Sequence, residues 1–139
     1  MGYLIDTCIW VEVERGAWAH ADVMSMTGDA PVFLSPVSIA ELYFSAEIAR
    51  EAGIRQKRLV ALQRLQRKPM LTIDGETGVI FGRLAAAIKA AGRSHRYRVQ
   101  DLWLACQAIQ HGFRFLTRNE RDFTDIPGLD LVVMPSATA

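Results

Sequence analysis

The segment YLIDTCIW, residues 3–10, decides the fold, because it joins a short apolar run to an acidic residue and then to a helical stretch. The apolar run at residues 3–5 predicts a buried strand, which Asp6 ends. A helix is expected at residues 8–15, before Gly16. Asp6 would therefore lie at the carboxyl end of a buried strand, where removing a carboxylate from water costs free energy unless a partner compensates.

Strands and helices alternate along the rest of the chain. Further strands are predicted at residues 31–34, 70–73, 114–117 and 129–133. Further helices are predicted at residues 17–26, from a Ser35 cap and Pro36 onward, at residues 50–68, along the apolar stripe of residues 81–88, and from Asp101 to Gly112. Continuous apolar strands that alternate with helices indicate an α/β fold, with a parallel sheet covered on both faces.

The composition is that of one globular domain. Of the 139 residues, 50% are hydrophobic and 22% are charged, which argues against a disordered chain. Residues 1–135 are expected to form the domain, and residues 136–139 a C-terminal tail. No apolar run approaches the roughly 18 residues of a membrane span, and the N-terminus lacks the basic and apolar regions of a signal peptide. We therefore expect a cytoplasmic protein with no membrane partner.

The cysteines and histidines are scattered along the chain. Cys8 and Cys106 form no CxxC pair, and His20, His95 and His111 lie far apart in sequence. A structural zinc site requires clustered ligands of these types. Two reduced thiols are therefore expected, rather than a disulfide or a zinc site.

The charge is unevenly distributed, although the net charge is only +1. Residues 1–47 carry seven acids and a single base, Arg15, whereas residues 48–68 carry seven bases and a single acid, Glu51. The basic helix predicted at residues 50–68 is either a solvated surface or a site for a nucleic acid or an acidic partner.

A second basic segment lies directly before Asp101. Residues 89–98 contain no acid, and they carry Tyr97 among their cations. Positive charge and an aromatic ring beside an acidic centre favour the approach of a nucleic acid. The candidates for phosphate contacts are Arg96, Arg98, Arg118 and Arg121.

Acidic and amide side chains are expected to gather at the carboxyl edge of the sheet, where open parallel sheets bind their ligands. These residues are Asp6, Glu41, Asp101 and the pair Asn119 and Asp122. Two carboxylates about 4 Å apart repel by roughly 4 kcal/mol at an effective dielectric near 20, so a cluster requires protonation or a cation. Because all the ligands are oxygens, Mg²⁺ or Mn²⁺ is the expected ion, and metal-dependent phosphodiester hydrolysis the expected chemistry.

Each of these positions also has a purely structural interpretation. Ser38 and Glu41 have the spacing of a capping box, which would make Glu41 a backbone partner only. Asp101 and Asn119 could each cap a helix, with Asp122 in the first turn of the second one. Asp6 could simply end a strand.

Four segments together resemble a known family. They are LIDTCIW at residues 4–10, SIAEL at 38–42, DLWLACQAIQHG at 101–112 and LTRNERDFTDIPGLDLV at 116–132. In this order they resemble the PIN-domain ribonucleases of the VapC toxin type. The resemblance covers essentially the whole chain, and the middle helices are its least diagnostic part.

This resemblance implies a three-layer α/β/α sandwich with a central parallel sheet of roughly five strands. It also implies Mg²⁺- or Mn²⁺-dependent cleavage of an RNA substrate, a homodimer, and neutralisation by a cognate VapB-type antitoxin. Asp6, Glu41 and Asp101 match the three acidic site positions. At the fourth position this chain has Asn119 where some relatives have an acid, so either Asp122 replaces it or Asn119 is a neutral ligand.

The expected function is therefore that of a metal-dependent endoribonuclease toxin. Asp6 and Asp101 would hold the ion, and Glu41 would be a ligand or would orient the attacking water. A catalytically silent PIN-like module that binds protein or RNA is the alternative, because Asn119 could mark the loss of activity.

Overall fold

The computed structural model describes residues 1–16 and 18–135. The expected tail at residues 136–139 and Ala17, the expected start of the second helix, lie outside the described residues. The elements are β1 (Tyr3–Ile5), α1 (Thr7–Arg15), α2 (His20–Thr27), β2 (Val32–Phe33), α3 (Pro36–Glu47), α4 (Ala52–Leu65), α5 (Gly75–Ala90), the 3₁₀ helix η1 (Arg96–Arg98), α6 (Val99–His111), β3 (Arg114–Thr117), the 3₁₀ helix η2 (Glu120–Asp122) and β4 (Asp130–Val133).

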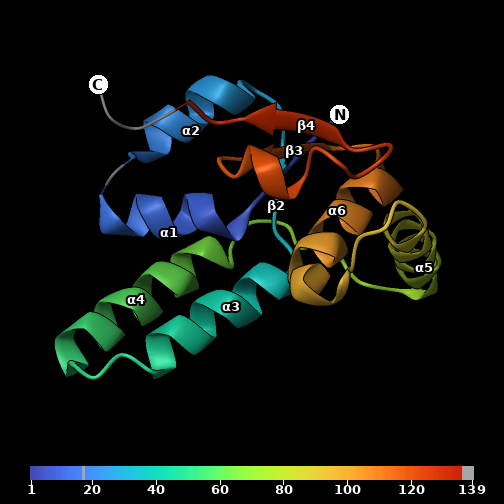
Figure 1. Cartoon of the computed structure of the whole chain (residues 1–139). Helices are drawn as coiled ribbons and strands as arrows, with labels where there is room; N and C mark the ends of the chain where they lie inside the picture. The colour runs from blue at the N-terminus through green and yellow to red at the C-terminus, as the bar shows by residue number, and fades with distance from the viewer. Residues whose placement is uncertain (17, 136–139) are drawn as a thin grey trace.

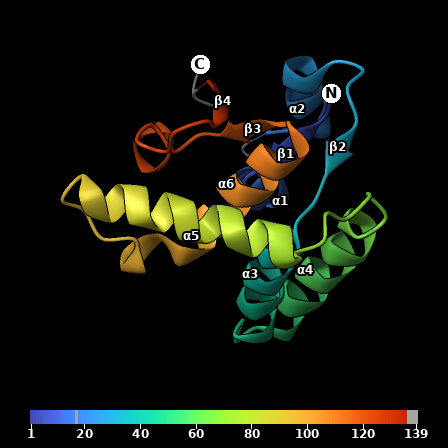
Figure 2. The ribbon, with the colours of Figure 1, turned by 90° about the vertical axis from the view of Figure 1, so that its right-hand side faces the viewer.

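The four strands form one parallel sheet in the order β2-β1-β3-β4. Because successive side chains of a strand point to opposite faces, β1 contributes to two separate cores. Tyr3 and Ile5 pack in a cluster with α1, α2, α3 and α4, whereas Leu4 packs in a cluster with α5 and α6. Figure 1 shows α1, α3 and α4 below the sheet and α5 and α6 beside it, and Figure 2 shows α5 in front of α6. The predicted three-layer α/β/α architecture is confirmed.

The sheet has four strands rather than the roughly five that we expected. The segment at residues 70–73 meets it only through an isolated parallel bridge between Leu34 and Met70. Beyond that bridge, the Nε2 amide of Gln107 on α6 donates to the carbonyls of Leu71, at 3.0 Å, and Thr72, at 3.3 Å. A side chain of α6, instead of a neighbouring strand, thus pairs with this segment.

Local signals set the ends of the helices that carry the candidate site. Ser35 Oγ accepts a hydrogen bond from the Val37 N–H at 3.1 Å, and Pro36 is the first residue of α3, as predicted. Helix α6 begins at Val99, two residues earlier than expected, so Asp101 lies inside its first turn. None of the helices in residues 1–16 and 18–135 is long and apolar enough to cross a membrane.

We predict that Gln107→Met lowers the free energy of unfolding by roughly 1 kcal/mol, because two carbonyls lose their donor. The loss is limited because Gln107 Oε1 has no hydrogen-bond partner in the described structure, so the substitution also removes an unsatisfied buried atom. Urea unfolding measures the difference. The matched control is Gln100→Met at an exposed position in the first turn of the same helix. Equal stability of the two variants would contradict the role given to Gln107.

Candidate active site

The Asp6 side chain is the buried centre of the site. Asp6 directly follows β1, and only 5% of its surface is exposed. Its Oδ2 atom accepts hydrogen bonds from Thr117 Oγ1, at 2.7 Å, and from Cys8 Sγ, at 3.3 Å. Burial raises the pKa of Asp6 above its ordinary value, and the bonds from Thr117 and Cys8 oppose that shift. Both side-chain donors contact Oδ2, and no side chain among the described residues donates to Oδ1.

The two cysteines are free thiols, as expected, and Cys8 belongs to this site. Cys106 is buried in α6, and Cys8 is half-buried beside Asp6. Burial and the neighbouring Asp6 charge raise the pKa of the Cys8 thiol to about 12. Cys8 is therefore a protonated hydrogen-bond donor to the carboxylate. Its position two residues after Asp6, at the start of α1, was the only sequence signal for this role.

Glu41 is joined to Asp6 through the first residue of α1. The Thr7 hydroxyl donates toward Ser38 Oγ, at 2.8 Å, and toward Glu41 Oε1, at 3.2 Å. Burial raises the pKa of Glu41, and the Asp6 charge raises it further. The capping-box interpretation was wrong, because Ser35 caps α3 and Ser38 is a buried residue within it. The spacing of Ser38 and Glu41 instead places both on the side of α3 that faces Thr7.

Asp101 brings a third carboxylate to the same place from α6, which packs against β1 and α3. Its pKa is raised to about 6, first by burial and then by the charges of Asp6, Asp122 and Glu41. Each of those repulsions requires the acids to lie within reach of one another. The structure thus brings the three acids predicted from the sequence into one electrostatic cluster, with Asp122 at its edge.

Asp122 and Asn119, the two candidates for the fourth position, differ in their surroundings. The Asn119 side chain is exposed and makes no capping hydrogen bond to η2, so it is not the helix cap that its position suggested. Its backbone N–H instead donates to Thr117 Oγ1 at 3.0 Å. Residues 118–122 and Thr124 line an open hollow of about 650 Å³. Asp122 lies in this hollow, and its charge acts on Asp101.

The donor chemistry fits a hard divalent cation. Asp6, Glu41 and Asp101 offer only oxygens, and the pKa of each is raised, so a cation would relieve both their burial and their mutual repulsion. Within residues 1–16 and 18–135, no group of three or more His, Cys, Asp or Glu side chains is placed so that it could hold a metal ion. Mg²⁺ keeps several water ligands when one or two carboxylates bind it, so three protein ligands are not required.

The four arginines proposed from the sequence differ in how freely each side chain can contact a phosphate. Arg98 is held by the protein: its Nη1 and Nη2 atoms each lie 2.8 Å from an Asp125 oxygen, and Nη2 also contacts the Asp122 carbonyl. The Arg98 hydrogen bonds hold the pKa of Asp125 at about 2. Arg118 lies 3.4 Å from Glu12 Oε1 and remains half-exposed. Arg96 and Arg121 are exposed and have no ion-pair partner among the described residues.

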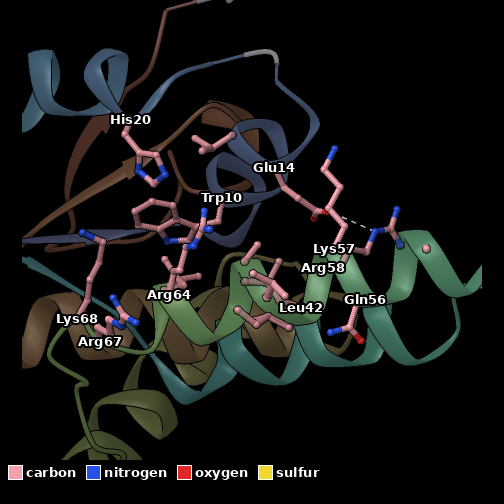
Figure 3. A pocket seen from close by; sticks show the side chains of 16 residues that line it. Trp10, Glu14, His20, Leu42, Gln56, Lys57, Arg58, Arg64, Arg67 and Lys68 are labelled. Atoms are coloured by element: carbon pink, nitrogen blue, oxygen red, sulfur yellow. Dashed lines mark hydrogen bonds and ion pairs between the residues drawn. The ribbon is translucent and has the colours of Figure 1, made fainter.

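A larger groove of about 790 Å³ lies between α1 and α4, away from the acidic cluster. Figure 3 shows Trp10 in its floor and a row of basic side chains along α4. The Trp10 indole is buried, and its Nε1 has no hydrogen-bond partner in the described structure. Arg58 Nε contacts Glu14 Oε1 at 3.1 Å across the groove. The remaining cations of the rim are Lys57, Arg64, Arg67 and Lys68.

We predict that Asp101→Asn stabilises the metal-free protein at pH 7 by about 1 kcal/mol, after allowance for the partial exposure of this carboxyl. The folded pKa of about 6 exceeds the ordinary value of 3.8, so the folded state binds more protons between these values. Stability therefore falls as pH rises from about 4 to about 6 and stays lower above that range. Urea unfolding in a chelator should show the gain at pH 7 and not at pH 3.

The control for this prediction is Asp29→Asn, at an exposed position outside the site. Asp29→Asn should leave the difference between the free energies of unfolding at pH 7 and at pH 3 unchanged. The same gain in both variants, or a gain that persists at pH 3, would contradict repulsion and burial at Asp101.

Comparisons with known proteins agree with the fold and with the family resemblance of the sequence. A family model of the PIN domain matches residues 3–129. The chain is 26% identical to Ribonuclease VapC of Rickettsia bellii, over 97% of this chain and 98% of the relative, and 28% identical to Ribonuclease VapC1 of Rickettsia felis, over 98% of each.

The structure is similar to that of DNA-bound VapBC from Salmonella typhimurium, with a TM-score of 0.83, 19% identity and coverage of 97% of this chain and 99% of that one. It also resembles VapBC2 from Rickettsia felis, bound to a promoter DNA fragment, with a TM-score of 0.80, 20% identity and coverage of 97% and 100%. The chain therefore belongs to the PIN domain family.

Proposed function

We propose that this protein is a Mg²⁺- or Mn²⁺-dependent endoribonuclease, the toxin of a toxin–antitoxin pair that acts in the cytoplasm. The observation that carries the proposal is the gathering of Asp6, Glu41 and Asp101, from three separate elements, at one edge of the sheet with raised pKa values. The names of the curated relatives, Ribonuclease VapC and VapC1, support the choice of RNA as substrate.

The chain's own residues would divide the chemistry between them. Asp6 and Asp101 would hold the ion, Asp6 through Oδ1, the oxygen to which neither of its side-chain donors binds. The bound ion would polarise the phosphate and lower the pKa of an attacking water. Glu41, whose pKa is raised and whose Oε1 is oriented by Thr7, would accept the proton of that water. Asp122 would complete the acidic set, with Asn119 as the alternative neutral ligand.

We expect Asp6→Asn and Asp101→Asn each to lower RNA cleavage by roughly 100-fold or more, because each removes a charged ligand or general acid–base partner. The assay incubates purified protein with single-stranded RNA and Mg²⁺ or Mn²⁺ and maps the new ends. A chelator should abolish cleavage by the wild type. Asp29→Asn is the matched control, since it makes the same chemical change outside the site.

Full activity in either site variant would contradict the assignment. The catalytically silent alternative predicts a different pair of results, namely no cleavage by the wild type and no change of its thermal midpoint on titration with Mn²⁺. A Mn²⁺-dependent rise of that midpoint, lost in Asp6→Asn, would support the metal site independently of the substrate.

The second partner that we propose is a cognate VapB-type antitoxin, because solved structures similar to this one include VapBC complexes. The groove between α1 and α4 suits an acidic amphipathic segment. Its floor, which includes the Trp10 ring, offers apolar contacts, and its α4 rim is basic. We also propose a homodimer, for which Phe44 on α3 and Ile48 at the C-terminal end of that helix supply exposed apolar surface, at 66% and 62% exposure.

We predict that the double variant Arg64→Glu/Arg67→Glu cleaves RNA normally but is neutralised at least 10-fold less effectively by the cognate antitoxin. Both side chains line the groove, and reversal of their charge would repel an acidic segment. The measurement is the antitoxin concentration that halves RNA cleavage. Arg83→Glu, on the exposed surface of α5, is the control. Unchanged neutralisation of the double variant would show that the antitoxin binds elsewhere.

A further inference from the structure

The connection between α5 and α6 is held to the body of the protein at three points. Arg93 Nη1 lies 2.6 Å from Asp125 Oδ2 at its start, and Arg98 makes its paired contacts with the same carboxylate at its end. Between them, the His95 ring lies edge-on to Phe81 of α5, with a centroid distance of 6.2 Å. These contacts fix the backbone of a segment that would otherwise be a free loop.

Two side chains of this anchored segment extend into solvent. Arg96 is exposed, and Tyr97 is 93% exposed, the highest value among the large apolar side chains of the described residues. A singly exposed apolar side chain is ordinary on a protein surface. Here, however, the exposed ring is carried on backbone held from both sides, so little conformational entropy would be lost when it binds a flat partner. The segment therefore presents one cation and one ring in a fixed place.

This place adjoins the acidic cluster. Arg98, the residue after Tyr97, contacts the main-chain oxygen of Asp122. Asp101 follows four residues after Tyr97, and η1 runs directly into α6. At 1.5–2.0 Å per residue, four residues span about 6–8 Å along a helical axis. A base stacked on Tyr97 would thus lie close to a phosphate held at the cluster.

The charge around Tyr97 suits a polyanion. Residues 89–100 contain no acid, and Lys89 and Arg96 form no ion pair with any described residue. An acidic protein segment would also pair with these cations, so the position of the ring beside the acidic cluster is what favours RNA. Single-stranded RNA uses both, because its bases stack on aromatic side chains while its phosphates contact cations.

We propose that Tyr97 is a stacking platform for an unpaired base next to the scissile phosphate, with Arg96 contacting a neighbouring phosphate. The proposal rests on the ribonuclease function proposed above and identifies the substrate as single-stranded RNA at this point of contact. Tyr97 is a substrate-binding residue in this account, and Arg93, Arg98 and Asp125 are positioning residues. The ring should act on any base, since every base has a face to stack.

The test compares Tyr97→Ala, Tyr97→Phe and Tyr97→Trp. Stacking predicts that the alanine variant loses roughly 5- to 100-fold in kcat/KM on a short single-stranded RNA, mainly through KM, and that Phe and Trp restore it. Because Tyr97 is so exposed, its replacement should leave the thermal midpoint unchanged. Met24→Ala, which removes a 64% exposed side chain on α2, is the control and should cleave normally.

A second arm identifies the stacked base. A series of RNAs is used, each of which lacks the base at one position. At one of these positions the wild type should lose the same factor in kcat/KM that Tyr97→Ala loses on intact RNA. Tyr97→Ala should lose nothing further on that RNA. Anisotropy of a labelled RNA gives the same comparison for binding, without cleavage. Normal cleavage and binding by Tyr97→Ala would overturn the proposal while leaving the ribonuclease function intact. The proposal would also be overturned if Tyr97→Ala weakened only the neutralisation by the antitoxin, because that result would assign the ring to a protein partner.

Wild-type protein that cleaves no RNA would instead contradict the proposed function. The binding arm would then decide the stacking proposal by itself. Weaker RNA binding by Tyr97→Ala, restored by Tyr97→Phe, would uphold it, and equal binding would overturn it.

Discussion

The parallel pairing of β1 with β3 is the constraint on which the site depends. It places the carboxyl ends of the two strands at one edge, so the Thr117 hydroxyl reaches the Asp6 carboxylate at 2.7 Å. That hydrogen bond partly offsets the burial of a carboxylate that is only 5% exposed. Helix α1 begins one residue later, and its Thr7 hydroxyl carries the same polar network to Ser38 and Glu41 on α3.

The packing of α6 is the source of the unfavourable electrostatics of the site. It buries Asp101 in the field of Asp6, Glu41 and Asp122, and the Asp101 pKa of about 6 reflects first that burial and then the repulsion that results. The folded state tolerates this repulsion because apolar clusters on both faces of the sheet hold β1, β3 and α6 in place. The site is therefore a strained electrostatic arrangement on a rigid frame, which is the condition under which a divalent cation binds with most benefit.

Sequence patterns predicted the frame and the acids for a local reason. Continuous apolar runs identified β1 and β3, and carboxylates beside or inside such runs stood out as unfavourable unless compensated. Sequence patterns failed where a side chain could bond either to a local partner or to a distant one. Ser38 was assigned to a capping box but bonds to Thr7, 31 residues away. The pairing of Arg98 with Asp125, 27 residues away, was not foreseen either. The shortened edge at residues 70–73 has the same origin, since Gln107 of α6 takes its carbonyls.

By itself, the sequence determined the α/β class, the parallel strands and the identity of Asp6, Glu41 and Asp101 as the residues that need explanation. Periodicity and burial are properties of short segments, so a single chain displays them. Only the tertiary structure decided that Thr7, Cys8 and Thr117 orient these acids, and that Asp125 anchors the segment bearing Tyr97. Those decisions depend on distances between side chains far apart in sequence, and such distances exist only once the sheet and its helices have packed.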